Sequence, residues 1–136
     1  MNKQEAIDAI NEFMQLLFTD YPAATQLMSD EIVWENFLPA HIPFGGRYEG
    51  ASGIRTYLDI IGESWGVGEI VFHDFIYDPE TRIMATPGVE KNGTAHSTGR
   101  TCDMDYMWEF RFTEAGKFSY IREYNDTAAI GGVFDQ

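Results

Sequence analysis

The chain has 136 residues, of which 44% are hydrophobic and 15% aromatic, and its formal net charge is −13. This length predicts one domain over residues 1–136 that buries about two-thirds of its unfolded surface, and the apolar content excludes a disordered protein. The acidic charge repels phosphate groups, so neither nucleic acid nor an anionic membrane surface is expected as a partner. Cys102 is the only cysteine, which excludes an intrachain disulfide and a cysteine-rich metal site.

Neither a secretory signal nor a membrane span is expected from this sequence. The first residues lead directly into an amphipathic pattern, whereas a secretory signal has a basic segment followed by an apolar one. No apolar run is long enough to span a bilayer. The sequence therefore predicts a cytoplasmic protein.

Helices are expected at the start of the chain. Apolar residues at helical spacing predict a helix over residues 3–18, with Asn2 and Glu5 positioned to cap its N-terminus. After Tyr21-Pro22, which stops this helix, a short second helix is expected over residues 23–28.

One strand and a third helix follow. Residues 31–38 alternate in the manner of a strand that closes at Pro39. The stretch 39–50 contains two prolines and three glycines, so it is expected to be a loop. Apolar residues from Ile54 to Trp65 then mark a third helix.

The second half of the chain reads as an antiparallel meander. Strands are expected over residues 69–77, 81–89, 94–112 and 117–126, with hairpin turns at Asn92-Gly93 and Ala115-Gly116. Helices followed by a long meander predict an α+β fold, in which helices pack on one side of a curved antiparallel sheet. Such a sheet forms a cone, and the open end of the cone is a natural pocket.

The last predicted strand carries the strongest candidate for chemistry. Strand alternation places Ile121, Glu123 and Asn125 on one face. If this face turns inward, the Glu123 carboxylate enters an apolar cavity, where its pKa should rise and it can transfer protons near neutral pH. The alternative is a surface glutamate paired with a cation of a neighbouring strand.

Two histidines are further candidates. His73 alternates with apolar residues in its predicted strand, and the pKa of histidine suits proton transfer near neutral pH. A hydrogen-bonded core histidine is the alternative. His41 lies in the loop before Pro43, either at the mouth of the pocket or facing solvent. The spacing of the three histidines matches no metal-binding motif, so no metal site is predicted.

Aromatic residues are abundant, and most of them are expected to pack in the core. A subset is expected to line a cavity suited to a flat ring system. The candidates for substrate binding, together with His41, are Trp34, Phe37, Tyr57, Tyr106 and Trp108.

Three segments carry a resemblance to a known family: Pro43–Gly50, Ser97–Arg100 leading into Asp105–Phe112, and Gly116–Phe118 followed by Arg122–Thr127. Together they resemble the SnoaL-like polyketide cyclases of the nuclear-transport-factor-2-like superfamily, which also contains ketosteroid isomerase and scytalone dehydratase. The resemblance covers essentially the whole chain. It implies the cone-shaped fold and a homodimer formed through the outer face of the sheet.

Two groups within this superfamily are similar at particular positions. The phenazine-biosynthesis A/B proteins carry a histidine matched by His73 and a glutamate matched by Glu123, which implies that these two residues are catalytic. Limonene epoxide hydrolases also place a catalytic carboxylate at the position of Glu123. Their additional Arg-x-Asp pair has no clear counterpart in Arg82–Thr86, so the resemblance does not imply epoxide hydrolysis.

The leading hypothesis is a cofactor-independent isomerase, cyclase or lyase that acts on a hydrophobic, ring-containing metabolite. Glu123 transfers a proton and His73 assists it. The same cone also serves as a binding module in other proteins. Two alternatives therefore stay open, a non-catalytic binding protein for a small hydrophobic ligand and a protein-interaction module that uses the exposed sheet.

Overall fold

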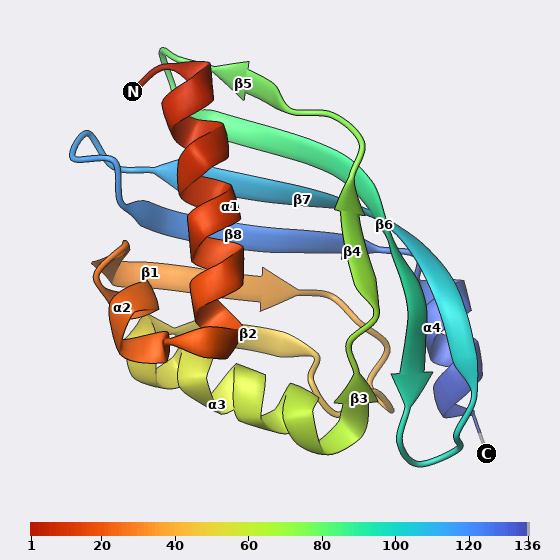
Figure 1. The fold of residues 1–136 in the computed structure, drawn as a ribbon. Coiled ribbons are helices and arrows are strands. Elements are labelled where there is room, and N and C mark those ends of the chain that lie inside the picture. Colours follow the sequence, from red (N-terminus) through yellow and green to blue (C-terminus); the bar gives the residue numbers. More distant parts are fainter. Residues whose placement is uncertain (136) are drawn as a thin grey trace.

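The structure, a computed structural model, describes residues 1–135 and consists of a strongly curved sheet whose concave side is crossed by helix α1 (Figure 1). The elements, in chain order, are α1 (Lys3–Thr19), α2 (Tyr21–Thr25), β1 (Met28–Asn36), β2 (Gly46–Glu49), α3 (Gly50–Ser64), β3 (Trp65–Gly66), β4 (Glu69–Phe72), β5 (Ile76–Asp78), β6 (Ile83–Ala95), β7 (Thr101–Phe112), β8 (Phe118–Asn125) and α4 (Thr127–Phe134). This confirms the predicted α+β fold.

All strands belong to one sheet. Its order is β2-β1-β8-β7-β6-β3, and β4 and β5 also pair with β6. Strand β1 runs parallel to β8, whereas the other pairs are antiparallel. The first and last strands of the chain thus lie side by side, which brings side chains from distant parts of the sequence together (Figure 1).

Helix α1 begins at the predicted cap. The Asn2 side chain accepts a hydrogen bond from the Glu5 backbone N–H at 2.8 Å, and the Glu5 carboxylate accepts one from the Asn2 N–H at 2.9 Å. Ala6, Ile10, Phe13 and Leu17 form its buried face. This apolar stripe packs into the hollow of the sheet because burial of apolar surface drives the association of the two layers.

Phe118, the first residue of β8, is at the centre of the aromatic core and is fully buried. Its ring stacks on Phe13 with centroids 4.4 Å apart, and it also contacts Phe112 at 4.7 Å and Phe110 at 5.8 Å. The core therefore joins α1 to the middle of the sheet.

The predicted hairpin at Asn92-Gly93 is wrong. Both residues lie inside β6, where the pairing with β7 shifts register between Glu90 and Gly93. Asn92 has a φ of 59°, and its backbone N–H donates to the Asp103 carboxylate at 2.9 Å. Asn92 has here the left-handed conformation that a tight turn also needs, so the residue pair has the composition of a hairpin without forming one.

Other helix and strand boundaries also differ from those predicted. The expected strand over 69–77 is interrupted after Phe72, and the expected loop over 39–50 contains the short strand β2. The sequence did not predict α4, which begins after Asp126, whose side chain accepts from the Ala129 N–H at 3.1 Å. The turn at Ala115-Gly116 is confirmed, with Gly116 at a φ of 80°. Within residues 1–135, no helix has both the length and the apolar composition that a bilayer crossing requires.

Candidate functional site

A narrow cavity of about 40 Å³ lies between the helices and the inner face of the sheet. Its lining is mostly apolar and includes all three tryptophans of the chain, Trp34, Trp65 and Trp108. A water molecule needs roughly 10–15 Å³ of such space, so the cavity has room for a few small groups in its present shape. The exposed apolar side chains of Phe18 and Val67 stand at its mouth, where two outer grooves meet it.

The Glu123 carboxylate faces this cavity from β8. Its Oε2 accepts a hydrogen bond from Trp34 Nε1 of β1 at 2.9 Å and a second one from the Tyr57 hydroxyl of α3. The parallel pairing of β1 with β8 sets Trp34 beside Ile121 and Asn36 beside Glu123, which explains why the indole reaches the carboxylate. Donors from β1 and α3 therefore hold this oxygen of the β8 carboxylate in place.

Burial raises the pKa of Glu123 above its usual value, because an ionised carboxylate loses its hydration inside the protein. The hydrogen bonds from Tyr57 and Trp34 act in the opposite direction, since they favour the charged form. A negative charge on Glu90 raises the pKa further. The net shift is upward, so Glu123 can exchange protons closer to neutral pH than an exposed glutamate.

Glu90 is a second carboxylate at the same cavity, and sequence reasoning missed it. It lies on β6 with 6% of its surface exposed, and its Oε2 accepts from Trp65 Nε1 at 2.8 Å and from the Gly68 backbone N–H at 3.0 Å. Burial raises the pKa of Glu90 as well. Each carboxylate is thus held by an indole N–H and by one further donor.

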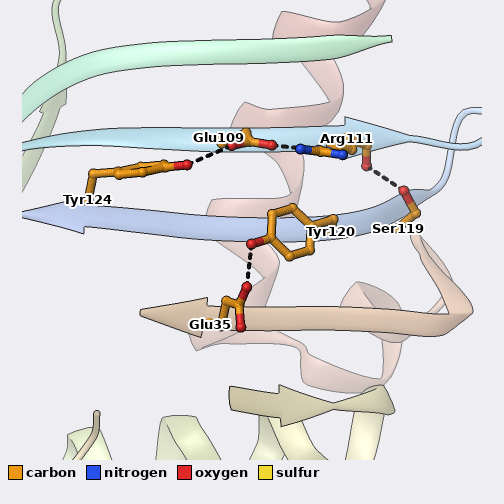
Figure 2. A network of polar contacts seen from close by, with 6 residues as sticks. All are labelled: Glu35, Glu109, Arg111, Ser119, Tyr120 and Tyr124. Atoms are coloured by element: carbon orange, nitrogen blue, oxygen red, sulfur yellow. Dashed lines mark hydrogen bonds and ion pairs between the residues drawn. The ribbon is translucent and has the colours of Figure 1, made fainter. Parts of the chain in front are cut away.

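The opposite face of β8 points away from the cavity and carries a polar network (Figure 2). Tyr120 donates to Glu35, and Tyr124 donates to Glu109 at 3.0 Å. Glu109 also pairs with Arg111. Because neighbouring residues of a strand face opposite sides, this outer network and the inner site occupy the same strand without contact between their side chains.

Three of the predicted substrate-binding residues line the cavity with Glu123, namely Trp34, Tyr57 and Trp108. Tyr106 does not line it, but its ring lies 5.7 Å from that of Trp108. Burial raises the pKa of Tyr106, and its buried hydroxyl has no hydrogen-bond partner among residues 1–135.

Three predicted site residues are exposed and lie away from the cavity lining. His73 directly follows the last residue of β4 in an irregular segment, where its backbone N–H donates to Pro87 O at 2.8 Å, and it does not line the cavity with Glu123. Phe37 is 65% exposed and lies 4.4 Å from the Arg122 guanidinium. His41 Nε2 lies 3.1 Å from a carboxylate oxygen of Asp135. None of the three lines this cavity, although Phe37 shares an outer pocket with Glu123 and Asn125.

The arrangement around Glu90 depends on Gly93. A Cβ atom at this position would lie 2.1 Å from Trp65 Cζ2 and 2.7 Å from Glu90 Oε2. Gly93→Ala is therefore expected to displace the indole and lower the free energy of unfolding by about 1–3 kcal/mol, the usual cost of overpacking. Urea unfolding measures this change.

Gly62→Ala is the matched control for this substitution. Gly62 lies in α3, and a Cβ atom there would meet no other side chain within 4 Å, so alanine should leave stability unchanged or raise it by up to about 1 kcal/mol. Equal stability of the two variants would contradict the close packing of Gly93 against Trp65.

The two carboxylates do not form part of a metal-binding cluster. No three His, Cys, Asp or Glu side chains are grouped as metal ligands in the part of the chain that the structure describes. What the site combines is two carboxylates of raised pKa in an apolar, aromatic cavity, an arrangement suited to proton transfer and to ligand recognition.

Comparisons with known proteins identify the fold. No protein-family model and no curated protein matches this sequence. Among solved structures, an NTF2-like protein from Burkholderia xenovorans is 22% identical, with a TM-score of 0.83 and 99% of each chain covered. A candidate isomerase from Bacillus subtilis is 21% identical over 100% of both chains, with a TM-score of 0.75.

A candidate SnoaL-like polyketide cyclase from Mesorhizobium loti is 18% identical, with a TM-score of 0.64 over 87% of this chain and 97% of that one. These neighbours agree with the SnoaL-like resemblance of the sequence. At such identities the likeness concerns the arrangement of the backbone. The chain has the NTF2-like fold.

Proposed function

We propose that the protein is a cofactor-independent enzyme that performs general acid–base chemistry, as an isomerase, cyclase or lyase, on a small hydrophobic molecule that contains a ring. The observation that carries this proposal is the Glu123 carboxylate, held by Trp34 and Tyr57 at an apolar cavity with its pKa raised. The candidate isomerase and cyclase of the same fold support the reaction class.

Glu90 takes the place that the sequence suggested for His73. Both carboxylates border one cavity, and the charge on Glu90 raises the pKa of Glu123, so a pH range exists in which one group is protonated while the other is ionised. The ionised group can remove a proton from a carbon next to a carbonyl, and the protonated group can donate to the carbonyl oxygen. The pair thus supplies a base and an acid without a histidine.

A binding protein without turnover is the second candidate. It is favoured by the hydrogen bonds that Glu123 already accepts, since donors to a carboxylate stabilise its charge and lower its strength as a base. The narrowness of the cavity points in the same direction. Measurement of proton transfer separates the two candidates.

The test is the exchange of α-protons of acetone and cyclohexanone for deuterium in D₂O, followed by ¹H NMR. The wild-type protein is expected to accelerate exchange above the buffer rate, and Glu123→Gln to return it to that rate. Glu109→Gln, on the outer face of the sheet, is the matched control and should keep full activity (Figure 2). Exchange that never exceeds the buffer rate, or that persists in Glu123→Gln, would refute the proposal.

A further inference from the structure

The charge of the cavity lining is unbalanced. Glu90 and Glu123 both border it, whereas no lysine, arginine or histidine is among the described residues of its lining. Buried carboxylates are normally paired with a cation, and leaving one without compensation costs several kcal/mol. Two acids that share an apolar cavity therefore need protons or a cationic ligand.

We propose that this cavity binds the primary ammonium group of a small apolar amine. The inference deepens the proposed function and rests on it for the cavity as the ligand site, but it concerns recognition and does not require turnover. The expected ligand is therefore a hydrophobic molecule that also carries a positive charge. Glu90 and Glu123 accept hydrogen bonds from the ammonium group, whose single positive charge balances one of the two carboxylates while the other carboxyl group keeps its proton.

Asn125 supplies an independent observation. Its Oδ1 is buried and accepts no hydrogen bond from residues 1–135, and its half-buried side chain, from the end of β8, lines the cavity. A primary ammonium group has three N–H donors, and the cavity offers three acceptor side chains, those of Glu90, Glu123 and Asn125. Each N–H of the ammonium group can therefore find an acceptor on one of these side chains.

The aromatic lining fits the same ligand. Trp34, Trp65 and Trp108 all border the cavity, and a cation is attracted to the face of a tryptophan, more strongly when it is desolvated. Two of these indoles also hold the carboxylates through their N–H groups. Aromatic rings and acids together are the usual surroundings of a bound organic cation.

One observation favours a neutral ligand instead. Trp108 Nε1 is a buried donor without a partner in the described chain, which a carbonyl oxygen would satisfy. An unpaired buried N–H costs less free energy than an uncompensated buried charge. The cavity holds two carboxylates and only one unpaired donor. Compensation of the carboxylate charge therefore favours an amine over a neutral carbonyl compound.

The experiment is isothermal titration calorimetry at about pH 8 in phosphate buffer, which contains no competing amine. The probes are benzylamine, benzyl alcohol and benzoate, which share a ring and differ in the charge of the attached group. Benzylamine is expected to bind at least roughly tenfold more tightly than benzyl alcohol, and benzoate not at all. Circular dichroism checks that the wild-type protein and the variants described next are folded.

Matched variants identify the groups responsible. Glu90→Gln and Glu123→Gln should each weaken benzylamine binding by roughly tenfold or more, while Glu109→Gln on the outer face leaves it unchanged. Asn125→Leu should weaken it less, because it removes a neutral acceptor. An affinity for benzylamine that the inner Gln variants retain would overturn the proposal.

The outcomes also separate this inference from the proposed function. If benzyl alcohol binds as tightly as benzylamine, the proposal of an amine ligand is wrong, but the proposed general acid–base chemistry is unaffected. Tight benzylamine binding without α-proton exchange would support the amine and favour a binding protein. If none of the three probes binds, the inference is wrong.

Discussion

Glu123→Gln is expected to remove proton exchange and to stabilise the protein above neutral pH. Loss of a general base usually lowers a rate by about 10²–10⁴-fold. The gain in stability arises because glutamine never has to be ionised inside the cavity. Its side-chain oxygen can accept from both Trp34 and Tyr57, as Glu123 Oε2 does, so the change removes charge and keeps the hydrogen bonds.

The direction of the pH dependence follows from the raised pKa of Glu123. In the unfolded chain this carboxyl loses its proton near the ordinary glutamate pKa, whereas the folded protein retains it to higher pH. Between these two values the folded state binds more protons, so the free energy of unfolding falls as pH rises. The contribution is fully present below the unfolded pKa and is lost above the folded one.

Urea unfolding of wild-type and Glu123→Gln protein at about pH 4 and about pH 8 measures this effect. The two proteins should be similarly stable at the lower pH, where Glu123 is protonated, and the variant should be more stable at the higher pH. Glu90 has a raised pKa of the same origin, so a smaller decline should remain in the variant. A variant that is less stable at the higher pH would contradict the burial of an ionised Glu123.

Phe118→Ala is expected to cause the largest loss of stability. The ring is fully buried and stacks on Phe13 from α1 and against Phe110 and Phe112 from β7. Removal of such a ring from a packed core costs about 3–5 kcal/mol, which is a large share of the stability of a typical domain. The midpoint of thermal unfolding should fall accordingly.

Phe37→Ala provides the control for this loss. Phe37 is 65% exposed, and its ring contacts the Arg122 guanidinium at the surface. Its removal should change the free energy of unfolding by less than about 1 kcal/mol. Similar losses in the two variants would contradict the central place of Phe118 in the core.

The position of Glu123 was predictable because alternation holds from Tyr120 to Asn125 of β8, after a shift in the pairing with β7 between Phe118 and Tyr120. Ile121 is buried and Tyr124 exposed, as strand periodicity requires, and the inward face carries the carboxylate to the cavity. That Glu123 transfers protons stays a prediction. Its donors Trp34 and Tyr57 lie 89 and 66 residues away in sequence, and no local pattern indicates that they converge on it.

Glu90 was missed for a local reason. The pair Asn92-Gly93 has the composition of a hairpin turn, so the predicted strand ended before Glu90 and left it at a turn. A signal was present in the sequence, since Met84, Thr86, Gly88 and Glu90 alternate, and all four are buried in β6. After Glu90 the alternation resumes one residue out of phase, with Gly93 and Ala95 buried, which is the pattern of a bulged strand.

His73 illustrates the converse case. Its apolar neighbours form a regular alternating pattern, but pairing with β6 ends at Phe72 and resumes only at Ile76. Residues 73–75 belong to no strand, and His73 and Asp74 are exposed while Phe75 packs against the core. Pairing between strands, which depends on residues far apart in the chain, decided where the strand ended.

The placement of the tryptophans gives the molecule an internal optical reporter. All three indoles border one cavity, so the intrinsic ultraviolet emission of this chain's tryptophans arises from that location alone. Two of them share a hydrogen bond with an ionisable group, and a change in its protonation alters the electric field at the chromophore. Emission intensity followed through a titration therefore records the charge state of the cavity without an attached dye.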